Sequence, residues 1–504
     1  MNPHPSRPTG HAGPTGHASP VAARAPARRL SALTLALATL LATGCANLAP
    51  TQGTPAAAIP TAWPAGGTAA TATASGQPQA GSIGWQALVS DARLRGAIAL
   101  ALQHNRDLRQ AALAVQQARA AHDIQSAAQR PTLQATAGAS ASRTPGQATS
   151  SGQASSSRSL SAGLGIAAWE IDLFGRLQNL KDAALESYLQ TEQAQRSTQL
   201  TLVAELAQAW LSLAADQAQL QLAEQTLKSQ RDSLALVQRR QALGVDSALT
   251  VAQTEATVES ARLAAAAYAA QVAQDRNALD LLAGTAVPAE LLPQLPLQTD
   301  AAVLVAVPEG LPSSVLQRRP DVLAAEHQLR AAAADIGAAR AALYPSISLT
   351  ASAGTASRSL GQLFQGGAWS FAPSISLPIF DSGARQASLR SAELARDSQL
   401  AAYDKTLQTA FREVADALAV RQSLAERLAA QQALVAAYAK ALSLSQARQR
   451  NGVDTALDVL DAQRSLFAAR QALISLQLLE QGNRITLFKV LGGGWADATA
   501  AAAG

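Results

Sequence analysis

The chain has 504 residues, 48% of them hydrophobic, 15% charged and only 4% aromatic, a composition typical of a globular protein and not of a disordered one. Its formal net charge of +5 comes largely from four arginines before residue 45; the rest carries 36 basic and 35 acidic side chains, so the charge gives no reason to expect a nucleic-acid partner. Abundant alanine, glutamine, leucine and serine favour long helices with small residues at their interfaces.

Residues 1–44 have the features of a secretory signal peptide. Arginines within 24–29 precede an apolar run at 30–42, which is shorter than the roughly 20 residues that a membrane-spanning helix needs. The stretch 41–45 resembles a bacterial lipobox and ends at Cys45, the only cysteine of the chain. We therefore expect cleavage before Cys45 and a covalent lipid on it; an ordinary signal peptide followed by a buried cysteine is the alternative.

The mature chain begins with a segment that lacks periodicity. Residues 45–84 are rich in alanine, threonine, glycine and proline, which indicates a lipid anchor followed by a flexible tether. A helix is predicted over about 86–130, before Pro131. Two segments then alternate small or apolar residues with polar ones at a period of two, which predicts strands at 131–142 and 159–169.

A long helix without proline is predicted over 176–243. Leucines recur in it every seven residues, which indicates a coiled-coil seam. These are Leu206, Leu213, Leu220, Leu227 and Leu234. At about 1.5 Å per residue this helix would be a rod of about 100 Å. A turn at Gly244, a shorter helix over 247–282 and a proline-rich connection at 285–312 are expected next.

The second half repeats this order. The predicted elements are a helix over about 313–344, strands at 346–355 and 369–380, a long helix over 385–450, a helix over 455–491 and a tail at 493–504. The long helix keeps the heptad phase at Val414, Leu428, Val435 and Leu442.

Matched residues show that the chain contains an internal duplication. Asp107 and Pro131 recur 214 residues later as Asp321 and Pro345. Gly175, Gly244 and Gly284 recur 208 residues later as Gly383, Gly452 and Gly492. Repeat 1 therefore covers 85–284 and repeat 2 covers 313–492.

The strands indicate a membrane part that one chain cannot complete. Each predicted strand has an apolar face and a serine- and threonine-rich face, as transmembrane barrels do. Four strands cannot close a barrel, and an open strand edge is not tolerated in lipid, so two, three or four chains must pool their strands. The predicted fold class is mainly α with a β-barrel membrane part, in two tandem repeats of long coiled-coil helices plus two strands.

The turn from Asn451 to Gln463 carries two carboxylates, Asp458 and Asp461, which lie three residues apart and so share one face of a helix. Solvated acids at a helix start are the alternative reading. Gly452, like Gly244 in repeat 1, is expected to end a helix with a positive φ angle.

Catalytic motifs are missing from the sequence. It contains neither a phosphate-binding G-x-x-x-x-G-K-[ST] loop nor H-E-x-x-H, and His104, His122 and His327 are scattered. We expect no enzymatic activity, no metal and no cofactor beyond the lipid on Cys45.

Several stretches together resemble the outer-membrane efflux proteins of the TolC/OprM type, in their lipoprotein branch. They are Leu316-Gln317-Arg318-Arg319-Pro320-Asp321-Val322, the matched pair Ile171 to Gly175 and Leu377 to Gly383, and the turn Gly452 to Gln463. The resemblance covers about residues 85–492. Arg319, Pro320 and Asp321 are expected to start and cap a helix.

The resemblance implies a homotrimer in the outer membrane, with a twelve-stranded β-barrel and a twelve-helix periplasmic α-barrel. It implies a passive duct that carries drugs or other small molecules from an inner-membrane, usually RND-type, pump and a periplasmic adaptor (membrane fusion protein) to the outside. A structural coiled-coil envelope lipoprotein, such as a spacer or stalk, is the alternative, but it would not need two matched pairs of alternating strands.

The resemblance also implies roles for single residues. Asp458 and Asp461, with Asp454 and Arg450, would line the periplasmic aperture. The adaptor would contact the tips Gly244, Val245, Gly452 and Val453, with tight turns that contact no partner as the alternative.

The two remaining implications concern the latch and the membrane interface. In the family, a tyrosine before the turn and an arginine after its glycine form part of a latch that holds the gate closed. The corresponding positions here are Gln449 and Asp454, so this latch is absent, and Arg448, Arg450 or Arg464 would have to replace it. Trp169 and Trp369 would belong to an aromatic belt at the membrane interface, with ordinary packing as the alternative.

Overall fold

The computed structural model describes residues 47–51, 59–60, 63, 84–294, 304 and 313–493. All of them belong to one compact unit within 47–504. The predicted signal peptide, Cys45, most of the predicted tether, residues 295–303 and 305–312 of the 285–312 connection and nearly all of the tail lie outside the described residues.

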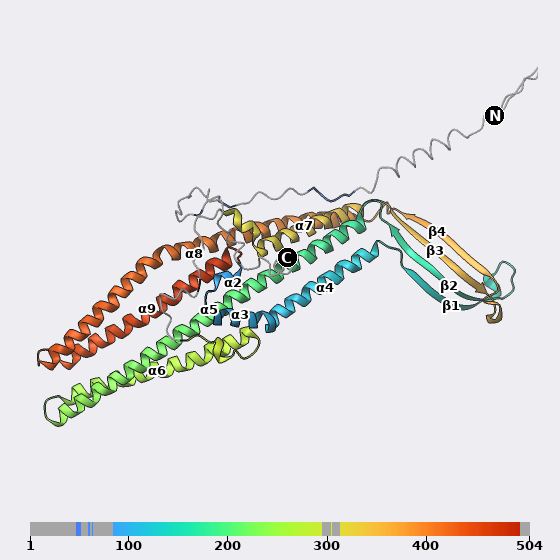
Figure 1. Ribbon diagram of the computed structural model, residues 1–504. Helices are drawn as coiled ribbons and strands as arrows, with labels where there is room; N and C mark the ends of the chain where they lie inside the picture. The colour runs from blue at the N-terminus through green and yellow to red at the C-terminus, as the bar shows by residue number, and fades with distance from the viewer. Residues whose placement is uncertain are drawn as a thin grey trace, which may run out of the picture. The chain divides into compact units, whose positions relative to one another are not determined.

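Within this unit the chain is mainly helical, with one sheet (Figure 1). The prediction of a mainly helical chain with two pairs of strands is confirmed. Among the described residues, none of the helices has an apolar stretch long enough to cross a membrane.

The N-terminal part of repeat 1 differs from the prediction of one helix over 86–130, which is wrong. The structure has three helices there, α2 (Trp85–Leu88), α3 (Ala92–His104) and α4 (Arg106–Ala128). Asp91 caps α3 by accepting hydrogen bonds from the backbone of the first turn, and Asn105 caps α4 in the same way. These caps need an extended backbone, which interrupts the helix although the helical periodicity continues.

The sheet joins the two repeats in the order β1-β2-β3-β4, with every pair antiparallel. Its strands are β1 (Leu133–Thr144), β2 (Ser155–Ile171), β3 (Ser346–Ser357) and β4 (Gly367–Ser376). The last strand was predicted to reach residue 380, but β4 ends before Pro378, which has no amide hydrogen for the ladder. Within the chain, β1 and β4 are the two edges.

The long helices follow the predicted plan. They are α5 (Arg176–Ala242), α6 (Ala248–Ala283), α7 (Pro320–Ala341), α8 (Ala384–Arg450) and α9 (Ala456–Val490), with a short 3-10 helix, Ser313–Arg318, before α7. The predicted helix over 313–344 is therefore split at Arg319. Leu206 and Leu213 of the heptad seam are fully buried, as is Val414 in α8, whereas the later members of both seams are only half-buried.

The duplication is visible in the backbone. Gly175 and Gly383, which precede the two long helices, have φ angles of 73° and 85°, and the glycines of the other two matched pairs also have positive φ. Both long helices contain 67 residues. The repeats therefore begin, turn and end their helices at equivalent positions.

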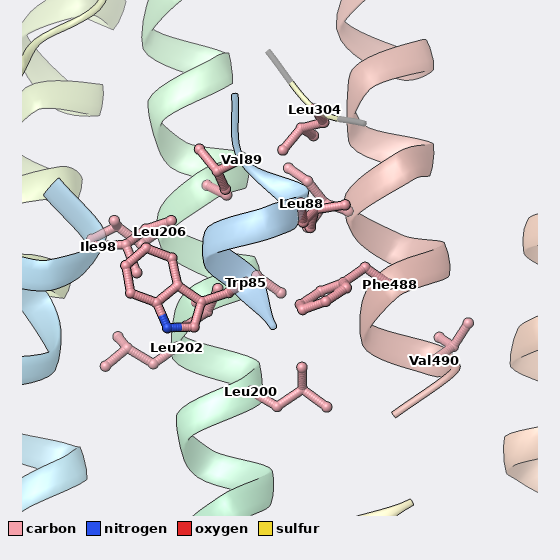
Figure 2. Close-up of a cluster of buried hydrophobic side chains, with 14 of the residues drawn as sticks. Trp85, Leu88, Val89, Ile98, Leu200, Leu202, Leu206, Leu304, Phe488 and Val490 are labelled. Carbon is pink, nitrogen blue, oxygen red and sulfur yellow. The ribbon is translucent and has the colours of Figure 1, made fainter. Parts of the chain in front are cut away.

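The hydrophobic core lies where α2 and α3 meet α5 and the C-terminal part of α9. Figure 2 shows Trp85 and Leu88 of α2 between Leu206 of α5 and Phe488 of α9. Leu304 is fully buried in the same cluster and pairs with Val89 in a short β-bridge. The 285–312 connection is thus tied to the helices at this level.

Parts of the predicted tether are attached to the folded unit. The carbonyl of Leu48 accepts a hydrogen bond from Arg340 of α7 at 3.3 Å. Trp63 stacks on Phe411 of α8 with ring centroids 4.8 Å apart, and Ile59 also packs against the core. The prediction of a flexible tether is wrong at these positions.

Candidate functional site at the two helical turns

Two turns of the same geometry connect α5 to α6 and α8 to α9. In the first, Val245 N–H donates to the Arg240 carbonyl at 2.9 Å; in the second, Val453 N–H donates to the Arg448 carbonyl at 2.9 Å. The glycine before each valine donates to the carbonyl three residues back, which completes a Schellman motif. A Cβ on either glycine would meet no atom, so the positive φ and not lack of space requires glycine.

Each turn carries an ion pair between residues six apart. Arg240 Nε lies 2.8 Å from an Asp246 carboxylate oxygen, and Arg448 Nε lies 2.7 Å from Asp454 Oδ1. Asp246 and Asp454 are the less exposed partners, at 13% and 16% of their side-chain surface. Sequence reasoning named Arg448 only as one possible latch residue and missed the pairing, although an arginine six residues before an aspartate recurs at both turns.

The Asp458 side chain is hydrogen-bonded to Thr455 at the start of α9. Thr455 donates to its carboxylate from the backbone N–H at 2.8 Å and from the hydroxyl at 2.7 Å, and the Thr455 hydroxyl accepts from the Asp458 N–H in return. These hydrogen bonds from Thr455, with the charge of Arg448 as a smaller cause, lower the pKa of the fully exposed Asp458. Its contribution to the helix start is therefore present above about pH 4 and lost as the pH falls further.

Asp461 lies one turn further along the exposed side of α9. Its carboxylate contacts Arg464, three residues on, and both side chains are more than half exposed. The two carboxylates predicted for the aperture therefore each have a partner within their own chain, while Arg450 is exposed. Their placement around an aperture stays a prediction.

The tips present apolar side chains to solvent. Val245 and Val453 are 63% and 62% exposed, and Leu243, Leu249 and Leu457 beside them are also exposed. Apolar side chains gathered at one end of a protein mark a surface for a partner.

A cavity of about 370 Å³ lies between α5, α6 and α9, close to the turns. Its wall includes Gln230, whose side-chain amide donates to Gln463 at 2.9 Å and whose carbonyl accepts from Thr257 at 3.1 Å. Sequence reasoning did not find this polar contact between the repeats, because no local pattern relates a glutamine on α5 to one on α9.

The two predicted membrane-interface tryptophans lie at different levels of the sheet. Trp169 pairs with Leu349 and Trp369 with Ala353, so they are four residues apart along β3, about 13 Å. Trp369 is 81% exposed, whereas Trp169 is half-buried beside the bulge at Ala168. One aromatic belt at a single level of the sheet therefore cannot contain both tryptophans.

In the part of the chain that the structure describes, no three His, Cys, Asp or Glu side chains lie close enough together to hold a metal ion.

Comparison with known proteins gives consistent matches over nearly the whole chain. The family model described as "Outer membrane efflux protein" matches residues 97–285 and 311–493. The chain is 46% identical over 471 residues to the toluene efflux pump outer membrane protein TtgC and, to the same extent, to the antibiotic efflux pump outer membrane protein ArpC, both of Pseudomonas putida. Each alignment covers 93% of this chain and 96% of the relative.

Solved structures agree with the sequence matches. The open state of the MtrE outer membrane channel of Neisseria gonorrhoeae is 36% identical, with a TM-score of 0.80. The alignment covers 90% of this chain and all of that chain.

Proposed function

Because the chain belongs to the outer membrane efflux protein family and is the outer-membrane channel of a tripartite efflux pump, we propose that three copies form one passive duct. The chain resides in the outer membrane, with a large part in the periplasm. The sheet forms the membrane part of the duct and the long helices form its periplasmic part. Export through it needs no chemistry in the duct itself, since the inner-membrane pump supplies the energy.

The free strand edges support assembly from several copies. Among the described residues, β1 and β4 have no partner strand on their outer sides in the sheet order. Unpaired backbone groups in lipid cost several kcal/mol each, by the general magnitude for buried polar groups, so these edges must pair with other copies. Three copies supply twelve strands, which is within the range of bacterial barrels.

The helical tips are the surface that contacts the periplasmic adaptor. Support comes from the matched exposed apolar residues, Val245 and Val453, on rigid turns of the same geometry. The adaptor in turn connects the duct to an inner-membrane pump of the RND type. The lipid on Cys45 anchors the N-terminus in the outer membrane, a proposal supported by the lipobox-like stretch 41–45.

The aperture is proposed to lie at the second turn. Three copies of Asp458 and Asp461 would focus a negative potential around the periplasmic mouth and favour cations. The ion pair between Arg448 and Asp454 holds this turn from within each copy, in the place of the family's missing latch.

The transported compounds are proposed to include small apolar molecules, because the relatives are named for the efflux of toluene and antibiotics. The inner-membrane pump selects the compounds, and the duct lets them pass.

Deleting the gene in its host tests the function. We expect lower tolerance to toluene and to antibiotics, and restoration by the wild-type chain. A deletion strain with full tolerance but a weakened envelope would instead support a structural lipoprotein.

A further inference from the structure

We propose that the outward end of the sheet binds the phosphate groups of lipopolysaccharide, the phosphorylated glycolipid of the outer leaflet, through Arg143 and Arg158. Both side chains are exposed and lie at the far end of the hairpin formed by β1 and β2. The inference rests on the proposed function, in which the sheet is the membrane part of the duct, and adds a lipid partner at one defined point.

Charged side chains are distributed unequally along the sheet. Between residues 131 and 169, and again between 345 and 380, every charged side chain is an arginine. These are Arg143 and Arg158 beside the β1–β2 loop, and Arg358 directly after β3. The first acidic side chains, Glu170 and Asp381, follow at the opposite end, beside the long helices. The hairpin end of the sheet is therefore purely basic.

The hairpin end faces away from the periplasm. β1 follows α4 and β2 leads into α5, so these strands meet the helices at one end and the β1–β2 loop lies at the other (Figure 1). With the long helices in the periplasm, the arginines lie on the outer side of the membrane.

Both arginines lie on the apolar face of the sheet. On β1 this face runs from Leu133 through alternate alanines to Arg143. On β2 it runs from Ile166 through alternate apolar residues to Arg158. The register agrees, since Leu133 pairs with Ile166. The arginines are therefore the last side chains of the lipid-facing side, at its outer end.

The spacing places the arginines at the level of lipid headgroups. Arg143 is ten residues beyond Leu133 on β1. Ten residues span about 34 Å along a strand, which at a tilt of about 40° is a height of about 26 Å. The apolar band of membrane barrels is about 25 Å tall, and a lipid-facing guanidinium is tolerated at its boundary but not at its centre. Both side chains thus stand where the hydrocarbon ends.

The two guanidinium groups form one site. Arg143 lies two residues beyond the β1 partner of Arg158, so the two are diagonal neighbours, about 7–8 Å apart across the strands. On the other face, the Ser142 and Ser157 hydroxyls share a hydrogen bond of 2.7 Å, which fixes the register at this point. Neither the strands at this end nor the two hairpin loops contain an acidic residue. An anion must balance the two charges, and phosphate oxygens match the donors of a guanidinium.

The lipid is favoured over a transported anion as the occupant. A compound inside the duct meets the opposite face of the sheet, which presents the uncharged Ser140 and Ser142 at this level. Lipopolysaccharide carries several phosphate groups and lies against the face that bears the arginines. Its charge and its position therefore both match, as they do where basic clusters bind anionic headgroups.

Photocrosslinking in intact outer membranes tests the position. A benzophenone side chain is introduced at Ser156, on the face of Arg158, or at Ser159, on the opposite face. We expect irradiation to attach lipopolysaccharide at position 156, detected as a band shift recognised by an antibody against the glycolipid, and none at position 159. The same side chain at Leu164, in the middle of the apolar face, should crosslink to lipid acyl chains and controls for membrane location.

Binding of lipopolysaccharide to the purified oligomer in detergent tests the chemistry. Arg143→Gln/Arg158→Gln should lower the affinity about tenfold or more, because charged hydrogen bonds to phosphate are lost. Arg143→Lys/Arg158→Lys should lower it less, since the charge stays but the paired donors do not. Arg106→Gln/Arg109→Gln removes two exposed charges from α4 and should leave the affinity unchanged. Native gels check that each variant assembles.

The outcomes separate the glycolipid site from the duct. Wild-type affinity in Arg143→Gln/Arg158→Gln overturns the site, as does equal affinity of the wild type for dephosphorylated lipopolysaccharide or for phosphatidylglycerol. Lipid crosslinking at Leu164 without glycolipid at Ser156, or with a protein there instead, also overturns it and leaves the duct standing. Absence of lipid crosslinking at Leu164 contradicts the membrane location of the sheet, and with it the proposed function.

Discussion

At the scale of single residues, the charged groups at the turns act first on their own chain. Arg448 pairs with Asp454, and Asp458 forms a capping box with Thr455, the N-cap residue of α9. The spacing of the residues predicted the turn and placed Asp458 and Asp461 on one helix face. It did not show which side chains pair with them, because the pairing depends on the path of the backbone after Gly452. Asp454, Asp458 and Asp461 therefore all have partners within their own chain, which the sequence did not indicate.

The ion pair of the second turn is predicted to affect gating more than stability. Asp454→Asn removes the partner of Arg448, whose side chain is 59% exposed, so the free energy of unfolding should fall by no more than about 1 kcal/mol. The less constrained turn should admit more antibiotic into cells, measured as growth inhibition. Asp246→Asn at the first turn is the matched control; equal sensitivity of wild type and Asp454→Asn would exclude a latch role.

A second residue-scale prediction concerns Asp216 on α5. Burial, followed by its interaction with Asp275 on α6, raises the pKa of Asp216 from 3.8 to about 6. Within the described chain, Asp275 Oδ2 is buried and has no hydrogen-bond donor, while Gln271 donates to the other oxygen at 2.8 Å. A proton on Asp216 would provide the missing donor.

The direction of the pH dependence of folding stability follows from the raised pKa of Asp216. The folded state binds this proton more tightly than the unfolded state, so the contribution of Asp216 to stability is fully present below about pH 4 and is lost as the pH rises through about 6. Asp216→Asn should flatten this dependence and raise the unfolding temperature at pH 7, measured by thermal melting from pH 4 to 8. The exposed Asp232→Asn on the same helix is the control, and an unchanged slope in Asp216→Asn would contradict the assignment.

At the scale of elements, the long helices and strands follow patterns that can be read locally. Heptad leucines and matched glycines predicted α5 and α8 within two residues of their ends. The break between α2, α3 and α4 was missed, since Asp91 and Asn105 act as caps only where the backbone leaves the helix. The contact between Gly337 and Asn179 was also missed, because the two residues meet only through the packing of α7 on α5.

That contact gives an element-scale prediction. Gly337→Ala would place a Cβ 2.5 Å from the Asn179 side-chain oxygen, so either Asn179 gives up its 2.6 Å hydrogen bond to the Gly175 carbonyl or the two helices separate. Overpacking of this kind costs roughly 1–3 kcal/mol, so we expect a lower melting temperature. Gly366→Ala, where a Cβ would meet no atom, is the control. Melting of Gly337→Ala at the wild-type temperature would show that α5 and α7 are not tightly packed there.

At the scale of the whole molecule, the duplication and the alternating strands predicted the fold class, and the motifs at 316–322 and 452–463, with the matched pair 171–175 and 377–383, indicated the family that the comparisons show. The composition of 45–84 predicted only a tether, yet Trp63 stacks on Phe411 far along the sequence. A single aromatic residue in a low-complexity segment carries no local pattern, so only the tertiary structure reveals where it docks.

The central claim is that copies of this chain form a conducting duct, and single-channel recording in planar bilayers tests it most directly. Purified oligomer should give stepwise, cation-selective currents, and Asp458→Ala/Asp461→Ala should conduct more and lose cation selectivity, because carboxylates in the proposed position would narrow the mouth and give it negative charge. Intact oligomer that gives no current, with or without these substitutions, would contradict the account.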